Sequence, residues 1–411
     1  MSIADPSRTS LSPRRPGRVS PPPPAILHGL HEPLEGLRVL DENRTPLGAV
    51  LWQALRDVKL WAGTPQTDRA SLFRPDCHLA RRAAVAALPP DPALAVPLET
   101  FTSLLADPAA ADPEGVALAC QRAARWAEGH ARPGTALAFA QAAALASPRS
   151  AAAALETGRL ALEAGEVPRA ESWFRRAIGL GRRGGDRVSL CQGCVYVAEL
   201  HAARGELEVA RVLYLRALRG ARRGGLKEIR AQALHGLFRV EAARGKGPEA
   251  EAFARAALRA HRRRHPRLSR VAREVAAFWS ERERHDLAAA ALRLLLPQLR
   301  RPSERVPVLA SLARACARAG DAEGYCEAAR EAWEIVNDAD GRAEHARPLM
   351  ELAHGAVALR EWEGAERAAQ RALEAAVCSK DTGVERAAEA LLASVWTSAG
   401  GMRWGAAPVA G

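Results

Sequence analysis

Aromatic residues are scarce in this chain: they make up 5% of its 411 residues. No run of alternating Val, Ile or Thr residues is present either, and this absence argues against a fold based on β-sheets. Ala, Leu, Arg and Glu dominate instead, and these residues favour helices. The composition therefore predicts an all-α protein.

Long apolar runs are also missing. A membrane span would require about 18 consecutive apolar residues, and residues 1–24 carry arginines and prolines where a signal peptide would have an apolar core. The seven cysteines lack the regular spacing of a disulfide framework, as expected for thiols kept reduced in the cytosol. We expect a cytoplasmic protein that does not enter a membrane.

The common motifs of catalytic and metal sites are absent. The sequence has no GxxxxGK[ST] phosphate loop, no HExxH, no GxSxG elbow, and no GxGxxG between a strand and a helix. One CxxC, at Cys191 and Cys194, lies inside a predicted helix without further ligands, so we interpret it as two packed thiols. His261 and His265 have only arginines and no carboxylate beside them. We expect no enzymatic activity, no cofactor and no metal site.

The chain does contain a repeat of forty residues. Four positions recur at this period: Gly165, Ala170, Phe174 and Ala177, then Gly205, Ala210, Tyr214 and Ala217, then Gly245, Ala250, Ala254 and Ala257. Such a period is typical of stacked helical units, because a single unit cannot bury its apolar face alone. The repeat therefore predicts an array of similar helix pairs.

The repeat also divides the chain. We predict a disordered, basic, proline-rich tail at residues 1–25, a helical N-terminal region at 26–108, the repeat array at 113–398 and a C-terminal tail at 399–411. An apolar face that includes Val50, Leu51 and Leu55 should dock on the first repeat, since the end of an array otherwise exposes its core. A helix-turn-helix that reads DNA is the alternative for this region.

Within the array we expect about seven antiparallel helix pairs, and we call the two members of each pair, in chain order, the first helix and the second helix. Prolines in first turns and glycines after last turns mark the breaks. The predicted pairs are residues 113–127 with 133–147, 150–164 with 166–182, 186–204 with 206–222, 226–244 with 248–264, 268–283 with 286–299, 303–319 with 321–337, and 342–359 with 361–377, and a last helix is expected near 383–398.

The string of Gly158, Gly165, Ala170, Phe174 and Ala177 resembles a tetratricopeptide repeat, and the resemblance covers roughly two thirds of the chain. The forty-residue period exceeds the family's usual length of about 34 residues, so the helices should be longer. The resemblance implies an α-α superhelix that serves as a scaffold or adaptor and holds a peptide or a partner protein. A HEAT-type array has a similar period and is the structural alternative.

Members of that family that clamp peptides commonly present Asn together with Lys or Arg from successive first helices. This chain has only two asparagines, Asn43 and Asn337, and neither lies in an internal first helix. We therefore expect recognition of a whole folded surface, or recognition by shape and charge.

Positive charge is concentrated in the middle repeats. Residues 169–305 contain 31 Lys and Arg against 14 Asp and Glu, although the whole chain has a net charge of only +12. Arginines recur at equivalent ends of successive second helices and should form a ridge that binds carboxylate or phosphate. The predicted ridge consists of Arg182, Arg183, Arg222, Arg223, Arg262, Arg263 and Arg264. A purely structural alternative is that they complement the helix dipoles.

These features lead to two hypotheses about function. The first is a protein-interaction scaffold, within a regulatory or signalling assembly, that has an acidic protein partner. The second is a nucleic-acid-associated regulator that binds the phosphate backbone through the same ridge. Trp173 is a candidate exposed anchor, because it and Phe174 are adjacent on a helix and cannot both face the same core.

Overall fold

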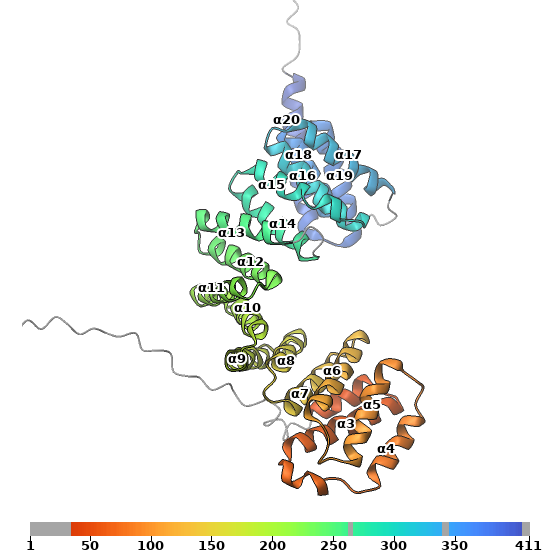
Figure 1. The fold of residues 1–411 in the computed structure, drawn as a ribbon. Helices are drawn as coiled ribbons and strands as arrows, with labels where there is room; N and C mark the ends of the chain where they lie inside the picture. Colours follow the sequence, from red (N-terminus) through yellow and green to blue (C-terminus); the bar gives the residue numbers. More distant parts are fainter. Residues whose placement is uncertain (1–33, 262–265, 339–344, 405–411) are drawn as a thin grey trace, which may run out of the picture. The chain divides into compact units, whose positions relative to one another are not determined.

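The computed structural model describes residues 34–261, 266–338 and 345–404, and these residues form helices joined by short turns (Figure 1). The described ranges contain no strand, so the predicted all-α class is confirmed. The structure divides into two units, of which the first ends at Arg244 and the second begins at Gly245. The predicted array at residues 113–398 therefore extends over both units, and its treatment as one domain stays a prediction. The predicted tail at residues 1–25 lies outside the described residues.

The first unit begins with a group of helices that covers the start of the repeats. Its elements are α2 (Leu34–Glu42), α3 (Pro46–Gly63), the 3₁₀ helix η1 (Gln66–Ser71), α4 (Cys77–Ala86) and α5 (Pro92–Ala106). The buried face of α3, with Leu51 and Leu55, shares one apolar core with Phe139 of the first repeat. Glu42 of α2 accepts hydrogen bonds at 2.8 Å from the backbone N–H groups of Gly134 and Thr135. The expected docking on the first repeat is confirmed.

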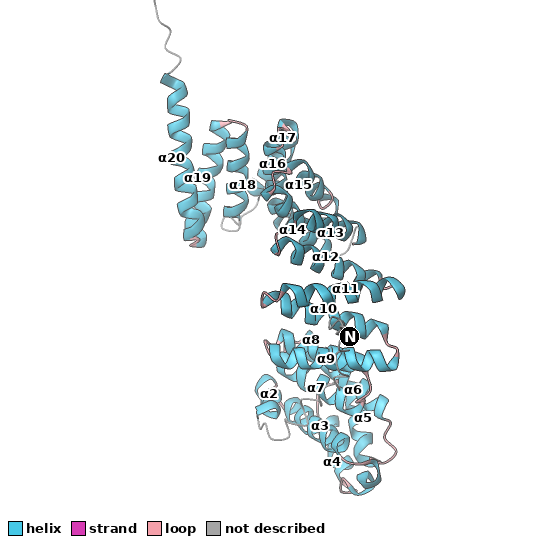
Figure 2. Cartoon of the chain, turned by 90° about the vertical axis from the view of Figure 1, so that its left-hand side faces the viewer, coloured by secondary structure: helices cyan, strands magenta, loops and turns pink. Residues whose placement is uncertain are grey.

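The rest of the first unit consists of three helix pairs and a further first helix. The helices are α6 (Pro113–Gly129), α7 (Pro133–Ala146), α8 (Ala151–Glu163), α9 (Val167–Gly184), α10 (Arg187–Ala203), α11 (Leu207–Arg223) and α12 (Lys227–Ala243). α6 pairs with α7, α8 with α9 and α10 with α11, and α12 packs on α11. Figure 2 shows these helices stacked side by side. Their ends agree with the predicted ends to within two residues, because proline, N-cap and glycine signals act locally.

Glycines allow the paired helices to approach closely. A Cβ atom added to Gly158 of α8 would lie 2.6 Å from the Phe174 ring of α9, and one added to Gly236 of α12 would lie 2.2 Å from the Tyr214 ring of α11. Phe174 also stacks on Tyr196 of α10, with ring centroids 4.6 Å apart. Glycines on first helices have no side chain, and the aromatic rings of neighbouring second helices fill the space beside them.

The second unit continues with helix pairs and a last helix. Its elements are α13 (Gly247–Ala260), α14 (Pro266–Glu281), α15 (His285–Arg293), the 3₁₀ helix η2 (Leu296–Gln298), α16 (Pro302–Arg318), α17 (Ala322–Asp338), α18 (Ala346–Ala358), α19 (Trp362–Ser379) and α20 (Thr382–Trp404). Tyr325 of α17 packs against Gly355 of α18, where an added Cβ would lie 2.9 Å from the ring. The same contact between a glycine of a first helix and an aromatic ring of a second helix therefore recurs in this unit.

Three predicted helix ends are wrong in the second unit. The helix expected at residues 286–299 ends at Arg293, because Pro297 lacks an N–H and its ring would clash with the carbonyl four residues earlier. α13 ends at Ala260, and His261 after it is extended. α20 continues to Trp404, so the first part of the predicted tail at residues 399–411 is helical.

Candidate functional site

The four described arginines of the predicted ridge lie at equivalent helix ends of the first unit. Arg182 and Arg183 occupy the last turn of α9, and Arg222 and Arg223 occupy the last turn of α11. All four are exposed. Gly185 and Gly225 follow with φ angles of +74° and +65°, a conformation that favours glycine and turns the chain into the next first helix.

Further arginines lie beside this end of the helices. Arg187 begins α10, Arg216 lies on α11, and both are exposed. We call the whole set the arginine edge: Arg182, Arg183, Arg187, Arg216, Arg222 and Arg223. Among the described residues, none of the six has a carboxylate in ion-pair distance. The edge is therefore a surface of uncompensated guanidinium groups.

The charge of the arginine edge affects the pKa values of buried groups next to it. Burial raises the pKa of the Cys194 thiol to about 11, and Arg216 and Arg182 act in the opposite direction. Burial, followed by the charge of Arg183, lowers the pKa of the Arg176 guanidinium, which donates a 2.8 Å hydrogen bond to the carbonyl of Pro148. Guanidinium groups from α9 and α11 therefore act on the same thiol, which lies on α10 between them.

The arginines at the opposite ends of these helices are paired. Arg204 follows α10 and contacts Glu171 of α9 at 2.7 Å. Arg244 follows α12 and contacts both Glu208 of α11 at 2.6 Å and Glu241 at 2.5 Å. Each of these ion pairs connects a first helix to the second helix of the preceding helix pair. These arginines stabilise the stack, whereas those of the arginine edge remain available to a ligand.

Part of the predicted ridge cannot be placed. Arg262, Arg263 and Arg264 lie outside the described residues, so the third step of the ridge stays a prediction. Arg187 and Arg216 were not part of the predicted ridge, because neither belongs to a run of adjacent arginines at a helix end. Their signal was the local excess of positive charge over residues 169–305.

The prediction that Trp173 is an exposed anchor is wrong, because its exposed fraction is 1%. Trp173 packs with Ala144 and Ala154 from the preceding helices, while Phe174 faces Gly158 and the next first helix. A second helix has neighbours on more than one side, so two adjacent positions about 100° apart can both be buried.

One polar contact on successive first helices was not foreseen. The Gln192 side chain of α10 donates a 2.9 Å hydrogen bond to the Gln232 side chain of α12, one repeat of forty residues later. Glutamine carries the same amide group as the asparagines of peptide clamps. Because the Gln192 amide donates to the Gln232 carbonyl oxygen, the pair ties two repeats together.

The described residues hold no cluster of three or more His, Cys, Asp or Glu side chains that could bind a metal ion. Cys191 and Cys194 are buried in α10, and a Cβ added to Gly220 of α11 would lie 2.5 Å from the Cys191 sulfur. Their predicted packing role agrees with this position. In the described ranges, no helix has the length and apolar character needed to cross a membrane.

The helix pairs, the forty-residue spacing and the close approach of glycine to aromatic rings decide the fold. It is a tetratricopeptide-like helical repeat. No family model matches the sequence, and no curated protein matches it. The described pairs continue this architecture through both units.

Solved structures with similar helices were found at low sequence identity. PilF of Pseudomonas aeruginosa is 14% identical over 61% of this chain and 98% of its own, with a TM-score of 0.43. The apo form of RapI is 12% identical over 64% and 99%, also with a TM-score of 0.43. The Rap conjugation gene regulator of the plasmid pLS20, solved with the Phr* peptide, is 14% identical over 82% and 98%, with a TM-score of 0.40. The fold assignment rests on the helix pairs of this chain itself.

Proposed function

We propose that this protein is a cytoplasmic protein-interaction scaffold whose arginine edge binds an acidic surface of a partner protein. One observation carries the proposal: Arg204 and Arg244, which directly follow first helices of the first unit, are paired with glutamates, whereas the residues of the arginine edge are exposed and have no carboxylate partner among the described residues. Guanidinium groups bind carboxylates in a bidentate geometry, and a cluster of them attracts an acidic partner over a long range.

A protein partner fits this surface better than nucleic acid does. Binding to single strands commonly uses aromatic side chains that stack on bases, but Trp173, Phe174 and Tyr214 near the edge are all buried. In the N-terminal helices, the apolar face of α3 covers the first repeat and is not available to a ligand. The nucleic-acid hypothesis therefore has no observation of its own in its favour.

The test is purification of the tagged full-length protein from its own cells, with nuclease, at low and at moderate salt, followed by mass spectrometry. The edge variant combines Arg182→Glu, Arg183→Glu, Arg222→Glu and Arg223→Glu. The matched control variant carries the same charge change at exposed arginines elsewhere in the first unit: Arg74→Glu, Arg82→Glu, Arg122→Glu and Arg125→Glu. We expect an acidic protein that the wild type and the control variant retain and the edge variant loses.

Two results would contradict the proposal. If the edge variant retained every partner of the wild type, the arginine edge would have no binding role. If edge-dependent binding disappeared on nuclease treatment and fell steeply with salt, the ligand would be nucleic acid instead.

A further inference from the structure

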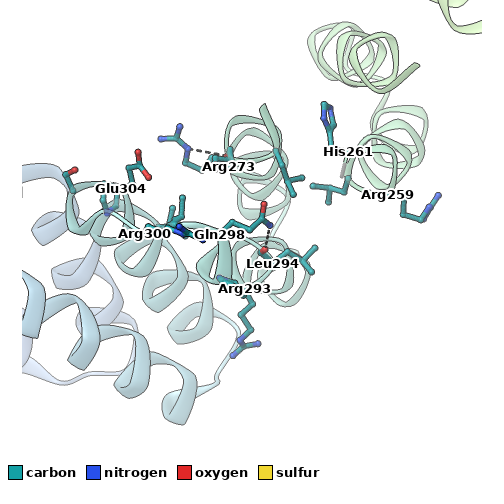
Figure 3. Close-up of a pocket in the computed structure, with 16 residues that line it drawn as sticks. Arg259, His261, Arg273, Arg293, Leu294, Gln298, Arg300 and Glu304 are labelled. Carbon is teal, nitrogen blue, oxygen red and sulfur yellow. Dashed lines mark hydrogen bonds between the residues drawn. The ribbon is translucent and has the colours of Figure 1, made fainter. Parts of the chain in front are cut away.

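The early end of α15 leaves a hollow in the second unit. α15 has 9 residues, whereas the second helices α17 and α19 have 17 and 18. After Arg293 the chain turns through η2 and enters α16, and a cavity of about 1200 Å³ opens beside this turn. Figure 3 shows its lining side chains, which come from α13, α14, α15, η2 and α16.

The wall of this hollow is fixed by hydrogen bonds. Arg305 of α16 donates to the carbonyls of Leu296 and Leu299 at 2.9 and 3.1 Å, and it also pairs with Glu331 of α17. The side chain of Gln298 donates to the carbonyl of Leu294 at 2.7 Å. These bonds satisfy the carbonyls that the interrupted helix leaves free, so the turn keeps its shape without a ligand.

The inner surface of the hollow is largely apolar. It is lined by leucine, valine and proline side chains: Leu258, Leu268, Leu294, Pro297, Leu299 and Val308. Leu294 is 51% exposed. An exposed leucine beside other apolar groups indicates a surface that gains free energy when another apolar side chain covers it.

The rim of the hollow is basic. Arg259, Arg273 and Arg300 line it and are exposed, and Glu304 is the carboxylate among the lining residues. None of these three arginines forms an ion pair with another described residue, whereas Arg293, also at the rim, contacts Asp321 at 2.8 Å. In Figure 3, Arg259 lies on one side of the hollow, and Arg273 and Arg300 lie on the opposite side.

We propose that this hollow, which we call the groove, binds an acidic segment of a partner protein. The segment places apolar side chains inside the groove and carboxylates against its rim. The three arginines come from different elements, so one small head group cannot reach all of them, but a peptide with several carboxylates can. The volume also exceeds that of most small-molecule sites, which enclose about 300–1,000 Å³. The chain's own residues 1–24 are basic and would be repelled by the rim.

This interaction surface is separate from the arginine edge, because the groove and the edge belong to different units. The test measures binding of a fluorescein-labelled synthetic peptide, in which glutamate alternates with leucine and phenylalanine, to the full-length protein by fluorescence anisotropy. Two control peptides replace glutamate by lysine, or leucine and phenylalanine by serine. We expect the first peptide to bind at least about tenfold more tightly than either control, since both charge and apolar contact contribute.

Variants locate the site. Combined Arg273→Glu and Arg300→Glu should weaken binding about tenfold or more, and Leu294→Asp, at an exposed position, should do the same. The matched control combines Arg367→Glu and Arg386→Glu, two exposed arginines of α19 and α20 outside the groove, and should bind like the wild type. The edge variant should also bind normally, so failure of the first proposal would leave this one intact.

Three outcomes would overturn the proposal. They are unchanged binding by the Arg273→Glu, Arg300→Glu variant, equal binding of the lysine peptide, and displacement of the probe by a peptide of residues 1–24. Circular dichroism of each variant, with helical content equal to that of the wild type, shows that lost binding reflects the site and not the fold.

Discussion

The two ends of the helices in the first unit differ in how their arginines are used. At the ends where the first helices α10 and α12 finish, Arg204 and Arg244 contact Glu171 and Glu208 on neighbouring helices. At the other ends, the arginine edge has no carboxylate in reach among the described residues. The two sets have the same residue type and the same forty-residue spacing. Their roles differ because glutamates lie opposite only one set.

The largest expected effect comes from removing the buried carboxylate at the paired end. Glu241 is 1% exposed and accepts from Arg211 at 2.6 Å and from Arg244 at 2.5 Å. Glu241→Gln replaces the carboxylate that neutralises these two guanidinium groups by an uncharged amide. We therefore expect the free energy of unfolding to fall by about 2 kcal/mol. Urea denaturation followed by circular dichroism measures this change.

Two controls check this prediction: a variant of an exposed carboxylate and a variant of the arginine edge. Glu208 is 71% exposed, so Glu208→Gln should change stability by less than about 0.5 kcal/mol. Neutral substitution of the same four arginines, Arg182, Arg183, Arg222 and Arg223, by Gln should lose no more than their complement to the helix dipoles, about 0.3 kcal/mol for each arginine. A loss in this neutral variant well above that of Glu241→Gln would mean that these arginines are structural as well.

A smaller effect is expected at the turns themselves. Gly205 has a φ angle of +78°, and Arg360, at the corresponding turn of a later pair, has a φ angle of +60°. A side chain in this region costs about 1 kcal/mol, so Gly205→Ala should destabilise the protein and Arg360→Gly should stabilise it by about that amount. Thermal unfolding of both variants checks the opposite signs. If both destabilised the protein, the turn conformation would not be the cause.

The smallest effect is a pH dependence at the paired end. Burial alone would raise the pKa of Glu171, but hydrogen bonds from Arg175 and Arg204 outweigh it, so the pKa lies below its ordinary value of 4.5. The stabilising contribution is therefore present above pH 4.5 and is lost as the pH falls through the folded-state pKa. The stability difference between wild type and Glu171→Gln, measured from pH 7 to pH 3, should shrink only at the acidic end. A difference that does not vary with pH would show that the charge of Glu171 is not involved.

Local signals in the sequence predicted most of the helices. Proline in first turns, aspartate and serine at N-caps, and glycine after last turns act on the nearest few residues, which is why the helix ends of the first unit were predicted to within two residues. Pro297 is a local signal of the same kind, but the helix before it was predicted to continue to residue 299, so the groove beside the early end of α15 was not predicted.

The candidate site was predicted less completely. The positions of Arg182, Arg183, Arg222 and Arg223 at exposed helix ends followed from the repeat, but their lack of partners did not. The error at Trp173 has the same origin, because burial there depends on Ala144 and Ala154 of earlier helices.

The sequence by itself determined that this protein is a helical repeat, because the repeat spacing, the turn glycines and the small residues opposite aromatic rings are encoded within each forty-residue unit. Only the tertiary structure decided which arginines are free, that Trp173 is buried and that a groove lies beside α15. These properties depend on the distances between side chains of different helices, and the packing of the helices sets those distances.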